Sequence, residues 1–148
     1  MPSALGRSAA SCSAPHMRVL YAVSVTRAKL KDAIDYIELA SLNFDQWNLS
    51  VSLRQYRGDE VEGMVQLVFP LVTGFRYLDE GDMLSYPFPE DAIRSYYHEI
   101  HEEGWYSQEQ EYGNVVSNDC REFVIATMNE CVCILTSHDP TLIEVEGV

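Results

Sequence analysis

The side chains best suited to chemistry lie between His98 and Glu103, where the sequence reads His-Glu-Ile-His-Glu-Glu. Imidazoles and carboxylates are common metal ligands and proton carriers. A zinc protease helix places two histidines four residues apart so that both reach one ion, but His98 and His101 are three apart. A glutamate with a histidine three residues later occurs in paired copies in di-iron bundles, and one copy supplies too few ligands. We therefore predict a solvated helix face, with no metal, no cofactor and no catalytic residue.

The cysteines form a second candidate group. Cys120, Cys131 and Cys133 could supply soft metal ligands together with His138, but no two of them have the spacing of a zinc knuckle. Cys131 and Cys133 are two residues apart, so on a strand both thiols point to one face, in a direction unsuited to a mutual disulfide. We interpret them as reduced thiols.

Several familiar signatures are missing from the sequence. It contains no glycine-rich phosphate loop, no Gly-x-Ser-x-Gly turn and no dinucleotide fingerprint. No apolar run approaches the roughly 20 residues of a membrane-spanning helix, and the first sixteen residues lack the apolar region of a secretory signal. These observations predict a cytoplasmic protein that is neither an enzyme nor a membrane protein.

The charge of the chain is concentrated in its second half. The formal net charge is −13, and residues 77–148 carry sixteen acidic residues against two basic ones, whereas residues 1–76 carry seven against eight. A negative field repels nucleic acids and anionic membranes and speeds the encounter with basic proteins. We predict a basic protein partner and no direct binding of nucleic acid or membrane. The alternative is that the acidity only keeps the protein soluble.

Acidic and aromatic residues alternate most densely between Tyr86 and Tyr112. Seven of these 27 residues are aromatic, and seven carboxylates accompany a single arginine. Tyrosine and tryptophan dominate binding hot spots, and carboxylates around them can pair with basic side chains of a partner. The predicted partner-binding residues are Tyr97, His98, Glu99, Glu102, Glu103, Trp105, Tyr106, Glu109 and Glu111.

The pattern of apolar residues predicts one domain after a disordered tail. Residues 1–16 are rich in serine and alanine without periodicity, and residues 17–148 form a single α+β domain. Strands are predicted at 18–25, 71–78, 131–136 and 141–146, the last as an edge strand, with a hairpin formed by 47–56 and 60–69. Helices are predicted at 27–41, 89–103 and 118–128, and a loop or irregular strand at 105–114.

This order of elements predicts the fold class. We expect an antiparallel sheet of about four to five strands with two or three helices packed on one face, a variant of the ferredoxin-like plan. Residues 119–136 are ambiguous, because enrichment in valine, isoleucine and threonine also favours two strands there.

Size, charge and aromatic content together suggest a function. In these respects the chain is similar to bacterial immunity proteins and antitoxins, which neutralise a basic toxin or nucleic-acid-handling enzyme by occluding its active site. The first alternative is a small hydrolase or metal-assisted enzyme that uses His98, His101 and nearby carboxylates. The second is a structural subunit of a larger assembly. The oligomeric state is not predicted.

Overall fold

The computed structural model describes residues 23–83, 92–102, 104–113 and 119–146. These residues form nine strands, all paired antiparallel, in two sheets. The larger sheet has the order β1-β6-β7-β8-β5, with bounds Val23–Lys29, Ser95–Glu102, Arg121–Ala126, Glu130–Thr136 and Gly74–Asp79. The smaller sheet has the order β2-β3-β4-β9, with bounds Tyr36–Asp45, Asn48–Arg57, Glu60–Phe69 and Thr141–Val145.

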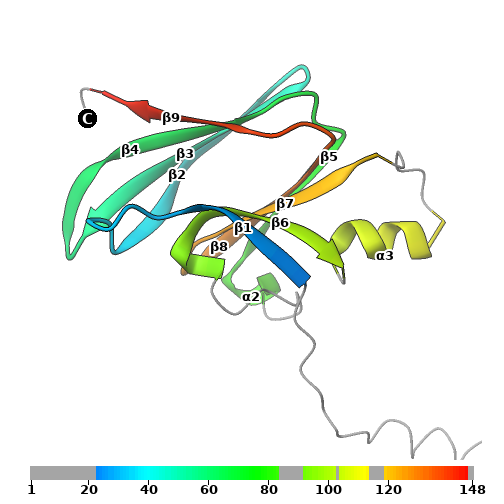
Figure 1. Ribbon diagram of the computed structural model, residues 1–148, viewed down its shortest axis with the longest axis horizontal. Coiled ribbons are helices and arrows are strands. Elements are labelled where there is room, and N and C mark those ends of the chain that lie inside the picture. The colour runs from blue at the N-terminus through cyan, green and yellow to red at the C-terminus, as the bar shows by residue number, and fades with distance from the viewer. Residues whose placement is uncertain (1–22, 84–91, 103, 114–118, 147–148) are drawn as a thin grey trace, which may run out of the picture.

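The two sheets pack face to face as a β-sandwich. In Figure 1 β4 and β9 cross the upper half of the molecule, and β1 and β6 cross the lower half. Apolar side chains from both inner faces share one core, in which β3 and β4 contribute Leu49, Val51, Leu53, Val65, Leu67 and Phe69, and β6 to β8 contribute Tyr96, Phe123, Ile125, Val132 and Ile134. The hydrophobic effect of this burial holds the sheets together.

Three short helical segments accompany the larger sheet. They are α2 (Glu80–Met83), the 3₁₀ helix η2 (Ala92–Arg94) and α3 (Trp105–Glu111). Ala92 and Trp105 pack with Ile100, Val124, Cys131 and Cys133 in a second apolar cluster. This cluster lies on the outer face of the larger sheet, so β6, β7 and β8 are buried on both faces. None of the helices in these ranges is long and apolar enough to cross a membrane.

The predicted α+β class is wrong, because the described chain is mostly strand and its helices do not cover a single sheet. The segment 27–41, predicted as a helix, instead contains the end of β1, a turn at Asp32 and Ala33, and the start of β2. A register shift between Leu39 and Ser41 interrupts the alternation of β2. Leu30 and Ile34, before β2, and Ile37, on β2, all pack on the core, and their spacing of four and then three residues imitates a helix.

The other two predicted helices are strands for a different reason. Residues 89–103 contain η2 and β6, and residues 118–128 contain β7. Because the larger sheet is covered on both faces, these strands are apolar on both sides and lose the alternation that identifies a half-buried strand. Within the segment 105–114, predicted as a loop or irregular strand, residues 105–111 form α3 instead.

The remaining strand predictions are confirmed where the structure describes them. The hairpin is β3 and β4, whose turn places Gly58 at φ 58°, and the later strands are β5, β8 and β9. β9 lies at the edge of its sheet, as expected. The predicted tail 1–16 and most of the strand at 18–25 lie outside the described residues.

Candidate functional site

Three of the predicted partner-binding residues, Tyr97, His98 and Glu99, point into the protein. Tyr97 is half-buried and packs edge-on against Phe69 and Phe123, with ring centroids 6.3 and 5.9 Å away. Burial raises the pKa of this tyrosine. His98 is fully buried, with Nε2 3.3 Å from the carbonyl oxygen of Ala92. The prediction of a solvated helix face is therefore wrong at this position, because β6 is covered on both sides.

Glu99 is buried at the centre of a charge cluster. It is 7% exposed, and its carboxylate accepts hydrogen bonds from both Arg27 (2.7 and 3.0 Å) and Arg121 (2.9 Å twice). Arg121 also donates to Asp139 at 2.7 Å. The hydrogen bonds from Arg121 and then Arg27 hold the pKa of Glu99 at about 2, against the opposing effect of burial. Because Arg27 of β1 and Arg121 of β7 both donate to it, the Glu99 carboxylate holds neighbouring strands together.

The two histidines of the same strand do not converge. Successive side chains of a strand alternate between its faces, and His101 shares the face of Glu99, with Nε2 3.8 Å from the Glu99 carboxylate. His98 lies on the opposite face, beside η2. Among the residues that the structure describes, no group of three or more histidine, cysteine, aspartate or glutamate side chains is arranged to hold a metal ion.

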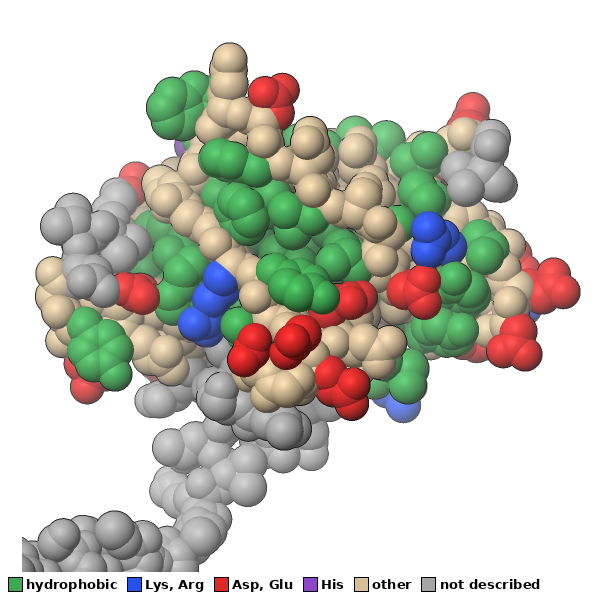
Figure 2. All heavy atoms as spheres, turned by 180° about the vertical axis from the view of Figure 1, so that it is seen from behind, with side chains coloured by type: hydrophobic (Ala, Val, Ile, Leu, Met, Phe, Trp, Pro, Cys, Tyr) green, Lys and Arg blue, Asp and Glu red, His purple; other side chains and the backbone are tan. Residues whose placement is uncertain are grey.

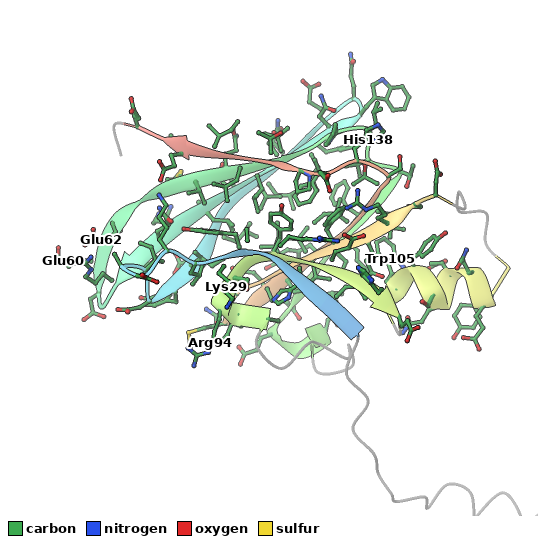
Figure 3. The ribbon with its side chains drawn as sticks, in the orientation of Figure 1. Lys29, Glu60, Glu62, Arg94, Trp105 and His138 are labelled. Atoms are coloured by element: carbon green, nitrogen blue, oxygen red, sulfur yellow. The ribbon has the colours of Figure 1, made fainter. Side chains whose placement is uncertain are left out.

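The rest of the predicted surface gathers around α3, except Glu103, which lies outside the described residues. Glu102 and Glu111 are exposed, whereas Tyr106 and Glu109 are half-buried. Trp105 is also half-buried: its Nε1 donates to Glu109 at 2.9 Å, and the Arg76 guanidinium lies 4.7 Å from its ring centre. Trp105, labelled beside α3 in Figure 3, therefore joins this helix to Arg76 of β5.

Buried polar contacts fix α3 against the larger sheet. Glu122, on β7, is 1% exposed, and its carboxylate accepts the backbone N–H of Tyr106 at 2.8 Å. A Cβ on Gly104 would lie 2.5 Å from this carboxylate, so only glycine allows the approach. Cys131 and Cys133 share one face of β8, as predicted, with sulfurs 3.7 Å apart. Their contact and then burial raise the pKa of Cys131.

Large apolar side chains are exposed where the edge strands β2 and β5 meet. Phe44 of β2 contacts Phe75 of β5 with ring centroids 5.3 Å apart, and Tyr77 follows two residues later on β5. The turn that carries Trp47 is joined to Leu71, because Val72 N–H donates to the Trp47 carbonyl at 2.7 Å. We call these five side chains the Trp47 surface: Phe44, Trp47, Leu71, Phe75 and Tyr77.

The backbone at this surface is strained. Leu71 has φ 48° and Gln46 has φ 57°, in the left-handed region that side chains other than glycine and asparagine avoid. Leu71 N–H donates to Asn48 Oδ1 at 3.3 Å, which helps to hold this conformation. Even so, Leu71 is 52% exposed and Trp47 is 64% exposed. Strain that projects two large apolar side chains into water indicates a function other than folding.

Acidic residues border the Trp47 surface. Asp45 precedes the turn, Asp79 ends β5, and Glu80 and Asp82 follow it in α2. Tyr77 donates to Glu130 at 3.4 Å. Figure 2 shows hydrophobic side chains across the middle of this face, with acidic side chains gathered directly below them. An apolar centre with a charged border is the usual organisation of a protein-binding surface.

The sequence interpretation did not find this surface. Trp47 lies at the start of a predicted strand, and aromatic and acidic residues are densest in residues 86–112 instead. The available signal was a tryptophan beside a turn, followed by strict alternation in β3. Phe75 and Leu71 join Trp47 only through contacts between strands distant in the chain.

Comparison with known proteins found no relative of this chain. No family model matches the chain, and neither a curated protein nor a solved structure does. The geometry of the protein itself therefore carries the functional argument.

Proposed function

We propose that this is a binding protein that docks on a basic partner protein through the Trp47 surface. The observation that carries the proposal is the exposed pair of Trp47 and Leu71 at the open edge of the sandwich, where Gln46 and Leu71 have left-handed backbone conformations. Tryptophan anchors contribute strongly to binding when they are buried in a partner. Burial of these two side chains would recover the stability that their exposure costs.

The negative charge of this protein indicates the chemistry of its partner. The acidic border and the net charge of −13 favour a partner that presents lysine and arginine around an apolar patch. In the specific form of the proposal, the protein acts in the cytoplasm as an immunity-type or antitoxin-type inhibitor. It covers the cationic site of a toxin or nucleic-acid-handling enzyme.

The edges of β2 and β5 suggest how the partner docks. Residues 39–44 of β2 carry no charge, and each of the two strands is paired on one side only. Uncharged edge strands accept an added strand from another chain. An extended segment of the partner could pair with either edge while its basic residues face the acidic border.

The test uses the purified protein as bait in an extract of the cells that produce it. A captured protein is then expressed alone, and its binding to wild type, Trp47→Ala and Leu71→Ala is measured. Ile143→Ala on β9 is the control, because Ile143 is also exposed but lies away from the surface. We expect a basic partner that is inhibited on binding and that binds the first two variants at least about tenfold more weakly.

Three results would contradict the proposal. Equal binding by the surface variants and wild type would place the contact elsewhere. An acidic partner would contradict the inference that the acidic border favours a basic protein. Self-association that Trp47→Ala abolishes, measured by analytical ultracentrifugation, would identify a second copy of the chain as the occupant of the surface.

A further inference from the structure

A pocket of about 340 Å³ opens at the end of the sandwich where the β1–β2 loop, the β3–β4 hairpin and the end of β9 meet. Ligand pockets typically have volumes of about 300 to 1,000 Å³, so this one suits a small ligand. The walls include Ile34, Met64 and Val145, which come from the three different segments. The pocket lies away from the Trp47 surface and shares no residue with it.

Gln55 lines this pocket from the inner face of β3. It is 5% exposed, and its Oε1 accepts a hydrogen bond from the Tyr96 hydroxyl of the facing sheet. This contact fixes the orientation of the side-chain amide. Within the described ranges, the amide nitrogen makes no hydrogen bond, so its two hydrogens are available to the pocket. A donor that faces a pocket and is not bonded within the protein can donate to a ligand or to water.

Gly63 keeps the space in front of this amide open. It pairs directly with Gln55 across the hairpin and has φ 145°, which side chains other than glycine rarely adopt. A Cβ built there would lie 3.5 Å from the Gln55 amide nitrogen, so a larger side chain would extend into the pocket. The glycine therefore both permits the backbone conformation and preserves the cavity.

The rim of the pocket is acidic. Three glutamates and one lysine line it: Glu62, Glu144, Glu146 and Lys31. Glu144 is paired with Lys31, and Glu62 lies 3.8 Å from Arg57, whereas Glu146 has no ion-pair partner within the described ranges. Figure 3 shows Glu62 beside Glu60 near the tip of the hairpin. The rim thus retains negative charge after its own pairs are counted.

We propose that this pocket binds a small ligand that carries an ammonium or guanidinium group together with a carbonyl acceptor, as a lysine amide does. The carbonyl oxygen accepts from the Gln55 amide, the aliphatic part contacts Ile34 and Met64, and the cation lies at the acidic rim near Glu146. Each part of the ligand meets a group of matching chemistry.

The test is a titration with Nα-acetyl-lysine methylamide, followed by NMR signals of the Gln55 side-chain amide and the Gly63 backbone amide. We expect saturable shifts of both signals, and weaker shifts with Nα-acetyl-norleucine methylamide, which lacks the cation. Glu146→Gln should weaken binding about threefold, as for an exposed ion pair, and Glu60→Gln should leave it unchanged, because Glu60 does not line the pocket. Gly63→Ala should weaken binding at least about tenfold, because the added methyl group reduces the cavity.

The absence of saturable shifts in the wild-type protein would overturn the proposal. Equal binding of the lysine and norleucine compounds would show that the pocket does not recognise the cation, and this would overturn the assigned ligand class. If Gly63→Ala does not fold, the charge variants and the neutral analogue still decide the outcome.

Discussion

The two long sides of the sandwich are built differently. On the side of β1 and β9, ion pairs join separate parts of the chain: Lys31 contacts Glu144, and Arg121 contacts Glu99 and Asp139. On the side of β2 and β5, no ion pair joins the two strands within the described ranges, and the contact between them is the aromatic pair Phe44 and Phe75.

This difference separates charges that hold the fold together from an apolar surface that is exposed to solvent. Where a charge is buried and paired, as at Glu99, it holds strands in place and is removed from contact with a partner. Where the edge is apolar and strained, the protein retains exposed area that folding alone does not require.

Removal of the buried carboxylate should have the largest effect on stability. Glu99→Ala leaves Arg27 and Arg121 without their shared partner, so the free energy of unfolding should fall by about 3 to 5 kcal/mol. Glu38→Ala is the matched control on β2, because Glu38 pairs with Arg54 near the surface, and it should cost less than about 1 kcal/mol. Urea denaturation measures both values, and similar losses in the two variants would contradict the comparison.

The same carboxylate should make stability depend on acid pH. The pKa of Glu99 is about 2 in the folded protein against an ordinary value of 4.5, so the folded state binds this proton less tightly than the unfolded state. Its contribution is therefore complete above pH 4.5 and is lost as the pH falls toward 2, a total of about 3 kcal/mol.

This pH dependence is measured by urea denaturation between about pH 6 and pH 2.5, for wild type and Glu99→Gln. Glutamine does not titrate, so the variant should lose less stability than wild type over that interval. Parallel curves for the two proteins would show that Glu99 has an ordinary pKa.

The two tryptophans should respond in opposite ways to truncation. Trp47→Ala should weaken binding of the partner by about 2 kcal/mol or more with little change in stability, because Trp47 is mostly exposed. Trp105→Ala should instead lower the free energy of unfolding by about 2 kcal/mol, because Trp105 packs on Arg76 and is hydrogen-bonded to Glu109. Isothermal titration and thermal unfolding separate the two effects, and a large stability loss in Trp47→Ala would assign that side chain to the fold.

Relief of backbone strain should have the smallest effect. Leu71→Gly removes a left-handed leucine, so stability should stay the same or rise by up to about 1 kcal/mol, while partner binding weakens. A matched Leu71→Ala variant keeps the strain and removes the side chain. A fall in stability of more than about 1 kcal/mol in the glycine variant would show that Leu71 contributes to the core.

The sequence by itself determined the features that depend on local alternation and composition. The β3–β4 hairpin was predictable because residues 49–53 alternate between the core and a more accessible face, and Gly58 marks the turn. The edge position of β9 and the shared face of Cys131 and Cys133 follow from the same period of two. The acidic excess of the second half was also read directly from the chain.

Only the tertiary structure decided which acidic and aromatic residues are available. Glu99 is bound by Arg27, 72 residues before it, and by Arg121, 22 residues after it, and neither pairing leaves a local pattern. β6 and β7 are strands although their apolar spacing resembles a helix, because a second layer covers their outer face. The Trp47 surface requires β2 and β5 to meet across two sheets. Exposure is a property of what packs on a side chain, and those neighbours come from distant parts of the chain.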